Sequence, residues 1–177
     1  MALSQTRLDS NAAVTHFINT YKLRDLKTCL YVGVAGNPLT HNGKPGPDLP
    51  ELYKNMQLTT LDFDKKWNPD IVGDVTKPAT FTSDTFDLVV MTQVIEHIPN
   101  VFDVPQAIKK LVNPQSGYAI IDCPWGKSGP GYHAEPPSFG DYWRISKDGM
   151  KQLFSDDFHI VETIQTDANV AVLLIRK

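Results

Sequence analysis

The chain has 177 residues, of which 41% are hydrophobic and 21% charged, and its formal net charge is −3 at pH 7. This length predicts one domain, residues 1–177, with a single sizeable core, and the slightly acidic balance argues against a polyanionic partner such as bulk nucleic acid. No apolar run is long enough to span a membrane and the first residues lack a signal-peptide pattern, so we expect a cytoplasmic protein.

The first 28 residues predict a helix and a polar approach to the core. Apolar residues recur at steps of three and four over residues 4–23, which is typical of an amphipathic helix. The core would then run from residue 29 to residue 177.

The first core strand ends in a turn of small residues. The β-prone run Cys29–Val34 contains Gly33 and leads into Ala35, Gly36 and Asn37, so a ligand could lie directly against the backbone there. Ordinary turn chemistry explains the same residues, and this stretch alone leaves both interpretations open.

Acidic residues mark the ends of the next two expected strands. Residues 58–63 form the second strand, and Asp62 near its end is suited to accept hydrogen bonds from ribose hydroxyls, with Asp64 as a competitor. A solvated turn or a helix cap is an equally good interpretation of Asp62. The third strand is expected within residues 70–75, and the connection to it is too short for a full crossover helix. Asp74 follows this strand, where it could hold a purine amino group, and an ordinary turn aspartate is an equally good interpretation.

The rest of the chain alternates between strands and helices before a closing pair of strands. Two loops rich in glycine and proline, residues 37–50 and 124–140, interrupt it. The pattern predicts an α/β fold: a Rossmann-like, doubly wound, mostly parallel sheet with a C-terminal antiparallel hairpin. The expected strands are residues 86–92, 117–123, 158–164 and 170–175, and the expected helices are residues 104–112 and 146–154.

Only two cysteines are present, Cys29 and Cys123, and both lie in strand-like apolar runs. We therefore expect buried free thiols in a reducing compartment rather than a disulfide. No cysteine and histidine cluster has the spacing of a zinc site, so no metal is expected.

Several motifs, in this order and spacing, resemble the class I S-adenosylmethionine-dependent methyltransferases. The closest resemblance is to the methyltransferase type 11-like branch that carries an Asp-Tyr-Trp-Arg motif. It covers the chain from about residue 29 to its end. The most specific carriers are Phe86–Pro99 and Asp141–Arg144, and the others are Tyr31–Asn37, Leu61–Phe63 and Pro69–Asp74.

The resemblance implies S-adenosyl-L-methionine as the cofactor and assigns it a pocket. The turn at residues 33–37 would wrap the methionine part, Asp62 would bind the ribose, and the adenine would lie beside the third strand. The cofactor-binding residues implied in this way are Gly33, Ala35, Gly36, Asn37, Asp62, Asp74, Val75, Thr92 and Gln93.

Three positions depart from the family pattern. Tyr31 replaces the usual acidic residue, and Ala35 and Asn37 replace two glycines of the loop. A second hypothesis is therefore a non-catalytic cofactor-binding domain or partner subunit with a degenerate glycine loop. A nicotinamide-dependent dehydrogenase is a poorer fit, because the loop lacks the G-x-G-x-x-G spacing.

Methyl transfer from a sulfonium depends largely on positioning, although an oxygen or nitrogen acceptor needs a base. His97, just after the fourth strand, and His133, in the loop after the fifth, are the catalytic candidates. His97 beside Glu96 has a structural alternative, since the pair can instead build the local loop.

The acceptor is expected to be a hydroxyl, or an amine, of a small molecule or saccharide. Tyr142, Trp143 and Arg144 are candidates for a substrate platform, and structural closure of the pocket is the alternative. Asp122–Trp125 resembles a tetrad of nucleic-acid base methyltransferases, but its position and the acidic composition argue against that acceptor. The sequence leaves the oligomeric state open.

Overall fold

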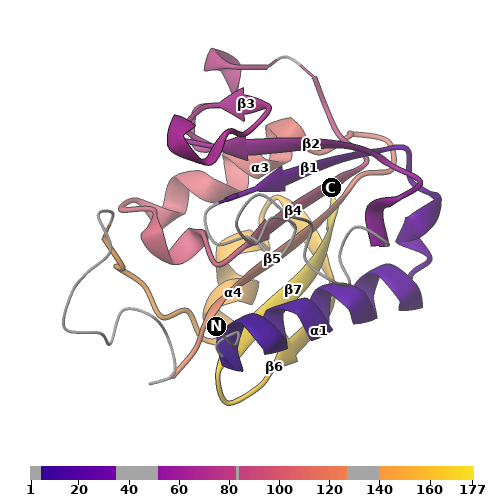
Figure 1. Ribbon diagram of the computed structural model, residues 1–177. Helices are drawn as coiled ribbons and strands as arrows, with labels where there is room; N and C mark the ends of the chain where they lie inside the picture. The colour runs from indigo at the N-terminus through magenta and orange to yellow at the C-terminus, as the bar shows by residue number, and fades with distance from the viewer. Residues whose placement is uncertain (1–4, 35–51, 83, 127–139) are drawn as a thin grey trace.

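The computed structural model describes residues 5–34, 52–82, 84–126 and 140–177. Within these residues the strands form one seven-stranded sheet in the order β3-β2-β1-β4-β5-β7-β6 (Figure 1). β7 is antiparallel to both of its neighbours, and the other pairs are parallel. The strands are β1 Thr28–Val32, β2 Gln57–Asp62, β3 Ile71–Val72, β4 Leu88–Thr92, β5 Tyr118–Pro124, β6 Phe158–Gln165 and β7 Asn169–Arg176.

The sheet confirms the predicted doubly wound fold with its antiparallel C-terminal pair. The chain builds outward from β1 to β3 on one side and from β4 to β5 on the other, so the strand order reverses between β1 and β4. In open α/β sheets, ligands bind outside the carboxyl ends of the strands at this reversal. The topology therefore directs attention to the ends of β1, β2 and β4.

Alternation along the central strands creates a hydrophobic core on each face of the sheet. In β4, Leu88 and Val90 belong to one core, and Val89 and Met91 belong to the other. Successive side chains of a strand point to opposite faces, which is why a continuously apolar strand is buried on both sides.

Helices cover both faces of the sheet (Figure 1). The first helix, α1 (Gln5–Thr20), supplies Val14, Phe17 and Ile18 to the core that contains Leu88. α3 (Val104–Leu111) and α4 (Lys147–Phe154) supply Ile108 and Phe154 to the other core. The three helices fall within the predicted ranges.

The predicted third strand is shorter than expected, because only Ile71 and Val72 pair with β2. Asp70 instead turns its carboxylate toward β2, where it accepts hydrogen bonds from the backbone nitrogen and hydroxyl of Thr60 at 2.8 and 2.7 Å. The connection from β2 to β3 contains one 3₁₀ turn, Lys65–Trp67, and no crossover helix, as its length predicted.

Local signals at the end of the chain are also confirmed. α4 begins after Ser146, whose hydroxyl oxygen accepts a hydrogen bond from the backbone nitrogen of Gly149 at 3.1 Å.

Cys29 and Cys123 are buried and free. In the part of the chain that the structure describes, no helix combines the length and the apolar character that crossing a membrane requires.

Candidate active site

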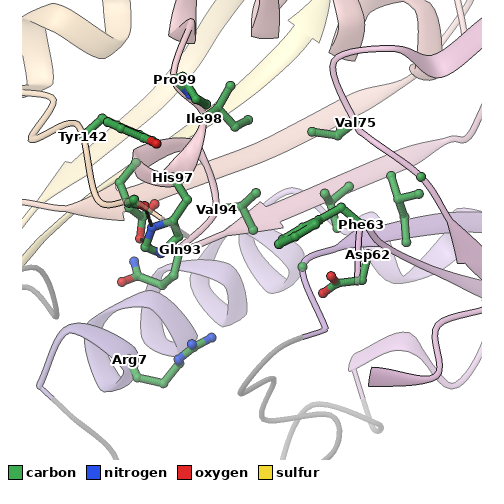
Figure 2. A pocket seen from close by; sticks show the side chains of 16 residues that line it. Arg7, Asp62, Phe63, Val75, Gln93, Val94, His97, Ile98, Pro99 and Tyr142 are labelled. Carbon is green, nitrogen blue, oxygen red and sulfur yellow. Dashed lines mark hydrogen bonds and ion pairs between the residues drawn. The ribbon is translucent and has the colours of Figure 1, made fainter. Parts of the chain in front are cut away.

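A cavity of about 520 Å³ opens where the strand order reverses, at the carboxyl ends of β1, β2 and β4. Figure 2 shows side chains on two sides of it, with Asp62, Phe63 and Val75 on one side and Gln93, His97 and Tyr142 on the other. The described residues that line it are Arg7, Val32, Gly33, Leu61, Asp62, Phe63, Gly73, Val75, Gln93, Val94, Glu96, His97, Ile98, Pro99, Gly140 and Tyr142.

Gly33 makes the turn after β1 possible. Its φ is 88°, and a Cβ at this position would lie 2.2 Å from Cγ2 of Val94. Only glycine tolerates both the left-handed backbone and this close approach. The turn after β1 therefore packs directly against the turn after β4. The other three predicted loop residues, Ala35, Gly36 and Asn37, lie outside the described part of the chain.

Asp62 lies on the cavity wall and also binds two backbone nitrogens. It is the last residue of β2 and is only 5% exposed, yet it lines the cavity. Its carboxylate accepts hydrogen bonds from the backbone nitrogens of Val34 at 2.8 Å and Asp64 at 2.9 Å. Each carboxylate oxygen has two lone pairs, so these bonds leave capacity for ligand hydroxyls.

The two residues predicted beside the adenine separate in the structure. Val75 is buried and lines the cavity. Asp74 is exposed and does not line it, because its carboxylate accepts hydrogen bonds from Thr76 and pairs with Lys77 at 3.1 Å. Phe63, which the sequence did not single out, lines the cavity on the same side as Val75 (Figure 2).

Thr92 lies beneath the cavity rather than on its wall. It continues the alternation of Leu88 and Val90, so its side chain faces the α1 side of the sheet. There its hydroxyl oxygen is 2.8 Å from the phenol oxygen of Tyr31. The position where the resembling family has an acid thus holds a neutral, buried hydrogen-bonded pair.

Gln93 lines the cavity in a left-handed conformation with φ of 56°. Its side-chain nitrogen donates to Oδ1 of Asp122 at 2.7 Å and to Oδ1 of Asn169 at 3.0 Å. These bonds fix the turn after β4 to the ends of β5 and β7. Burial raises the pKa of Asp122 to about 6, an effect that the hydrogen bonds from Ser10 and Gln93 oppose.

His97 presents one ring nitrogen as a potential proton acceptor. Nδ1 is 2.6 Å from the carbonyl oxygen of Gly140, and because a carbonyl only accepts, Nδ1 carries the proton. Burial lowers the pKa of His97, so at neutral pH the ring is uncharged and its lone pair is on Nε2. This nitrogen is 3.7 Å from Oε1 of Glu96.

Glu96 is fully buried on the 3₁₀ turn η4 (Ile95–His97). Among the described residues, neither of its carboxyl oxygens has a hydrogen-bond partner. The pKa of Glu96 is raised to about 8, chiefly by burial and to a smaller extent by the charges of Asp122 and Asp141, against the opposing Arg144. The carboxyl group is therefore protonated at neutral pH, a state that no sequence pattern indicates.

The Asp-Tyr-Trp-Arg motif divides between the cavity and its supporting structure. Tyr142 is 55% exposed and lines the cavity. Trp143 instead donates its indole N–H to the carbonyl oxygen of Ile98 at 2.8 Å. Arg144 forms a two-pronged ion pair with Asp141, with Nη2 2.9 Å from Oδ2. Trp143 and Arg144 do not line the cavity, and their contacts hold Tyr142 in place.

One predicted catalytic residue lies outside the described part of the chain, and one residue that was not predicted lines the cavity. His133 lies outside the described residues. Arg7, which no sequence pattern singled out, reaches the cavity from α1. An arginine on an amphipathic helix carries no pattern that distinguishes it from a solvent-exposed one. Over the described ranges, no three side chains of histidine, cysteine, aspartate or glutamate gather in a way that could hold a metal ion.

A family model described as a methyltransferase domain matches residues 50–121. No curated protein sequence matches the chain.

Solved structures of methyltransferases have the same fold. The N-methyltransferase NodS from Bradyrhizobium japonicum WM9, in complex with S-adenosyl-L-homocysteine, aligns with a TM-score of 0.68 and 11% identity over 98% of this chain and 88% of NodS. The PH0226 protein from Pyrococcus horikoshii OT3 aligns with a TM-score of 0.64 and 15% identity over 98% of this chain and 91% of PH0226. The glycopeptide N-methyltransferase MtfA, complexed with S-adenosyl-L-methionine, aligns with a TM-score of 0.63 and 11% identity over 92% of this chain and 94% of MtfA. The chain thus has the Rossmann-like fold of class I methyltransferases.

Proposed function

We propose that this protein is an S-adenosylmethionine-dependent methyltransferase that modifies a hydroxyl or an amine of a small molecule or saccharide. The observation that carries the proposal is the buried Asp62 carboxylate at the end of β2, on the wall of the cavity and tied to the turn after β1. A carboxylate at this point of a doubly wound sheet is suited to ribose hydroxyls. Bound S-adenosyl-L-homocysteine in NodS and S-adenosyl-L-methionine in MtfA support the same cofactor here.

The described residues fit such a cofactor. Gly33 and Val94 both line the cavity, and glycine is required at position 33 because a Cβ there would clash with Val94. Asp62 would hold the ribose, and the apolar Phe63 and Val75 would flank the adenine. When bound, the cofactor supplies a methyl group already activated on a sulfonium. The task of the protein is therefore mainly to orient the acceptor and to exclude water.

His97 is the proposed base within the described residues, and His133 remains a second candidate. The Nε2 lone pair of His97 can take the proton that a hydroxyl or ammonium acceptor loses, while Gly140 holds the ring through Nδ1. Activity should then fall in acid, as the pH drops through the lowered pKa of His97, which lies below the ordinary histidine value of about 6.5. His97→Gln should remove this loss of activity at low pH. An unchanged dependence of activity on pH would show that another group is the base.

The acceptor side of the cavity is assigned to Tyr142, whose exposed ring can stack on a sugar or small ring. The family branch with the Asp-Tyr-Trp-Arg motif and a reducing, cytoplasmic location are part of the same proposal. The two buried free thiols support that location. NodS and MtfA are N-methyltransferases, so amines belong in any acceptor screen.

A second candidate function is a non-catalytic cofactor-binding or partner subunit. The observation that favours it is the replacement of the expected acid by Tyr31, whose hydroxyl is engaged by Thr92. A carboxylate for the ammonium group of the cofactor is therefore missing at that position.

Calorimetric titration with S-adenosyl-L-homocysteine, with NAD as the control ligand, tests the proposal. We expect micromolar binding of the first and no binding of NAD. Transfer of a labelled methyl group to hydroxyl and amine acceptors would then separate the enzyme from the non-catalytic subunit. Absence of S-adenosyl-L-homocysteine binding would reject the methyltransferase and favour the non-catalytic partner subunit.

A further inference from the structure

Two hydrogen bonds dock the first half of α1 onto the carboxyl end of the sheet. The Ser10 hydroxyl donates to Oδ2 of Asp122 at 2.5 Å, and the Thr166 hydroxyl donates to the carboxylate of Asp9. Arg7 lies three residues before Ser10, and helix residues three apart share a face. The anchor that holds Ser10 against β5 therefore also points Arg7 toward the cavity.

The guanidinium of Arg7 reaches the cavity wall, and Figure 2 shows the side chain extending from α1 beneath Gln93. The positive charge of Arg7 also acts on Asp122, at the same end of the sheet. Burial raises the pKa of Asp122, and the charge of Arg7 opposes that rise. Among the described residues that line the cavity, Arg7 is the one arginine or lysine. Arg7 is thus the candidate contact for an anionic group of a ligand among these residues.

The end of β1 has lost the complementary negative charge. Tyr31 stands at the position of the expected acid, and its hydroxyl is paired with that of Thr92 under the cavity. The amino-acid end of S-adenosylmethionine carries one ammonium and one carboxylate. A neutral strand end together with a cationic helix favours recognition through the carboxylate.

We propose that Arg7 binds the carboxylate of the methionine moiety of the cofactor and so anchors the end that the altered loop no longer holds through an acid. The inference rests on the proposed function. Arginine suits this role, because its planar fork matches a carboxylate with two parallel hydrogen bonds.

Three ligands and one substitution isolate the interaction by calorimetry. The ligands are S-adenosyl-L-homocysteine, its analogue without the carboxylate (S-adenosyl-3-thiopropylamine), and 5′-methylthioadenosine, which lacks the whole amino-acid end. Arg7→Met should weaken S-adenosyl-L-homocysteine by about 10-fold to 100-fold, the range of a lost charge-assisted contact. It should leave the affinities for the other two ligands unchanged. The wild-type protein should bind the analogue about as weakly as Arg7→Met binds S-adenosyl-L-homocysteine.

Two further variants complete the test. Arg24→Met makes the same change on an exposed residue of the turn after α1 and should bind all three ligands like the wild type. Arg7→Lys keeps the charge but loses the fork, so its affinity for S-adenosyl-L-homocysteine should fall between those of the wild type and Arg7→Met. It also serves if Arg7→Met does not fold.

Equal S-adenosyl-L-homocysteine binding by wild type and both Arg7 variants would overturn the inference while leaving the proposed function intact. The inference also fails if Arg7→Met weakens all three ligands alike, since Arg7 would then shape the cavity without recognising a carboxylate. A variant that changes only the KM of an anionic acceptor would overturn it as well. If the wild type binds none of the three ligands, the proposed function itself fails and this inference fails with it.

Discussion

The phenol oxygen of Tyr31 lies 2.8 Å from the hydroxyl oxygen of Thr92, and this pair joins the ends of β1 and β4 beneath the cavity. Both residues are buried, and the Tyr31 ring packs edge-on against Tyr53 with centroids 6.2 Å apart. Burial raises the pKa of Tyr31 to about 12, so the pair is neutral at physiological pH. Tyr31 stands where the resembling family has an acidic residue. Its hydrogen bond to Thr92 joins β1 to β4 just before the turns in which Gly33 packs against Val94.

Removing both partners of this pair should cost less stability than the two single removals added together. Tyr31→Phe leaves the Thr92 hydroxyl buried without its partner, and we expect it to lower the free energy of unfolding by about 1–3 kcal/mol. Thr92→Val leaves the buried phenol of Tyr31 without its partner in the same way. The double variant should be less destabilised than the sum of the two, by about 1 kcal/mol, in urea unfolding. Additive effects would show that the hydroxyls do not stabilise each other.

Asp62→Ala should weaken S-adenosyl-L-homocysteine binding by about 1–3 kcal/mol, because a charged hydrogen-bond acceptor for the ribose is lost. The matched control is Asp64→Ala, two residues along. Asp64 caps the 3₁₀ turn through Lys66 and does not line the cavity. Calorimetry on both variants gives the comparison, and equal affinities would reject the ribose role of Asp62. Since Asp62 also binds the backbone of Val34, a melting curve should accompany each titration.

The buried carboxyl of Glu96 predicts a dependence of stability on pH. Its pKa is raised from 4.5 to about 8 in the native state, so the unfolded chain ionises first as the pH rises. The contribution of Glu96 to stability is complete below pH 4.5 and is lost as the pH rises through about 8. Glu96→Gln cannot ionise. We therefore expect the stability of the wild type relative to this variant to fall by about 2–5 kcal/mol between pH 4 and pH 9.

Urea unfolding at several pH values measures this difference. Other groups, such as Asp122 with its pKa of about 6, titrate in both proteins and largely cancel in the comparison. Asp25→Asn, on an exposed residue, is the control and should follow the wild type at every pH. Parallel curves for the wild type and Glu96→Gln would mean that Glu96 is ionised in the native protein.

The sequence was sufficient where local pattern decides structure. The continuous apolar run of β4, the acid at the end of β2 and the cap at Ser146 each depend on near neighbours, and the structure has all three. Arg7 was missed for the opposite reason. Its place at the cavity depends on the bond between Ser10 and Asp122, which are 112 residues apart.

Thr92 shows an intermediate case. Strand alternation with Leu88 and Val90 already implies that its side chain points to the face covered by α1. The family resemblance nevertheless assigned it to the pocket lining, and the structure places its hydroxyl on Tyr31. Asp70 was expected inside a strand. Its carboxylate instead accepts a hydrogen bond from the backbone nitrogen of Thr60 in β2, and no hydrophobic periodicity in the sequence indicates this contact.

The Asp-Tyr-Trp-Arg motif predicts a separation of stability from acceptor binding. Arg144→Met would leave the carboxylate of Asp141, whose side chain is only 5% exposed, without its ion-pair partner. Breaking a buried pair on one side costs about 3–5 kcal/mol, so this variant should lose much of its stability. Tyr142→Ala removes an exposed ring, and we expect its stability to change by less than about 0.5 kcal/mol. Its KM for the acceptor should rise while its affinity for S-adenosyl-L-homocysteine stays constant. Urea unfolding, calorimetry and acceptor kinetics together measure these effects, and a Tyr142→Ala enzyme with an unchanged acceptor KM would leave the motif a purely structural role.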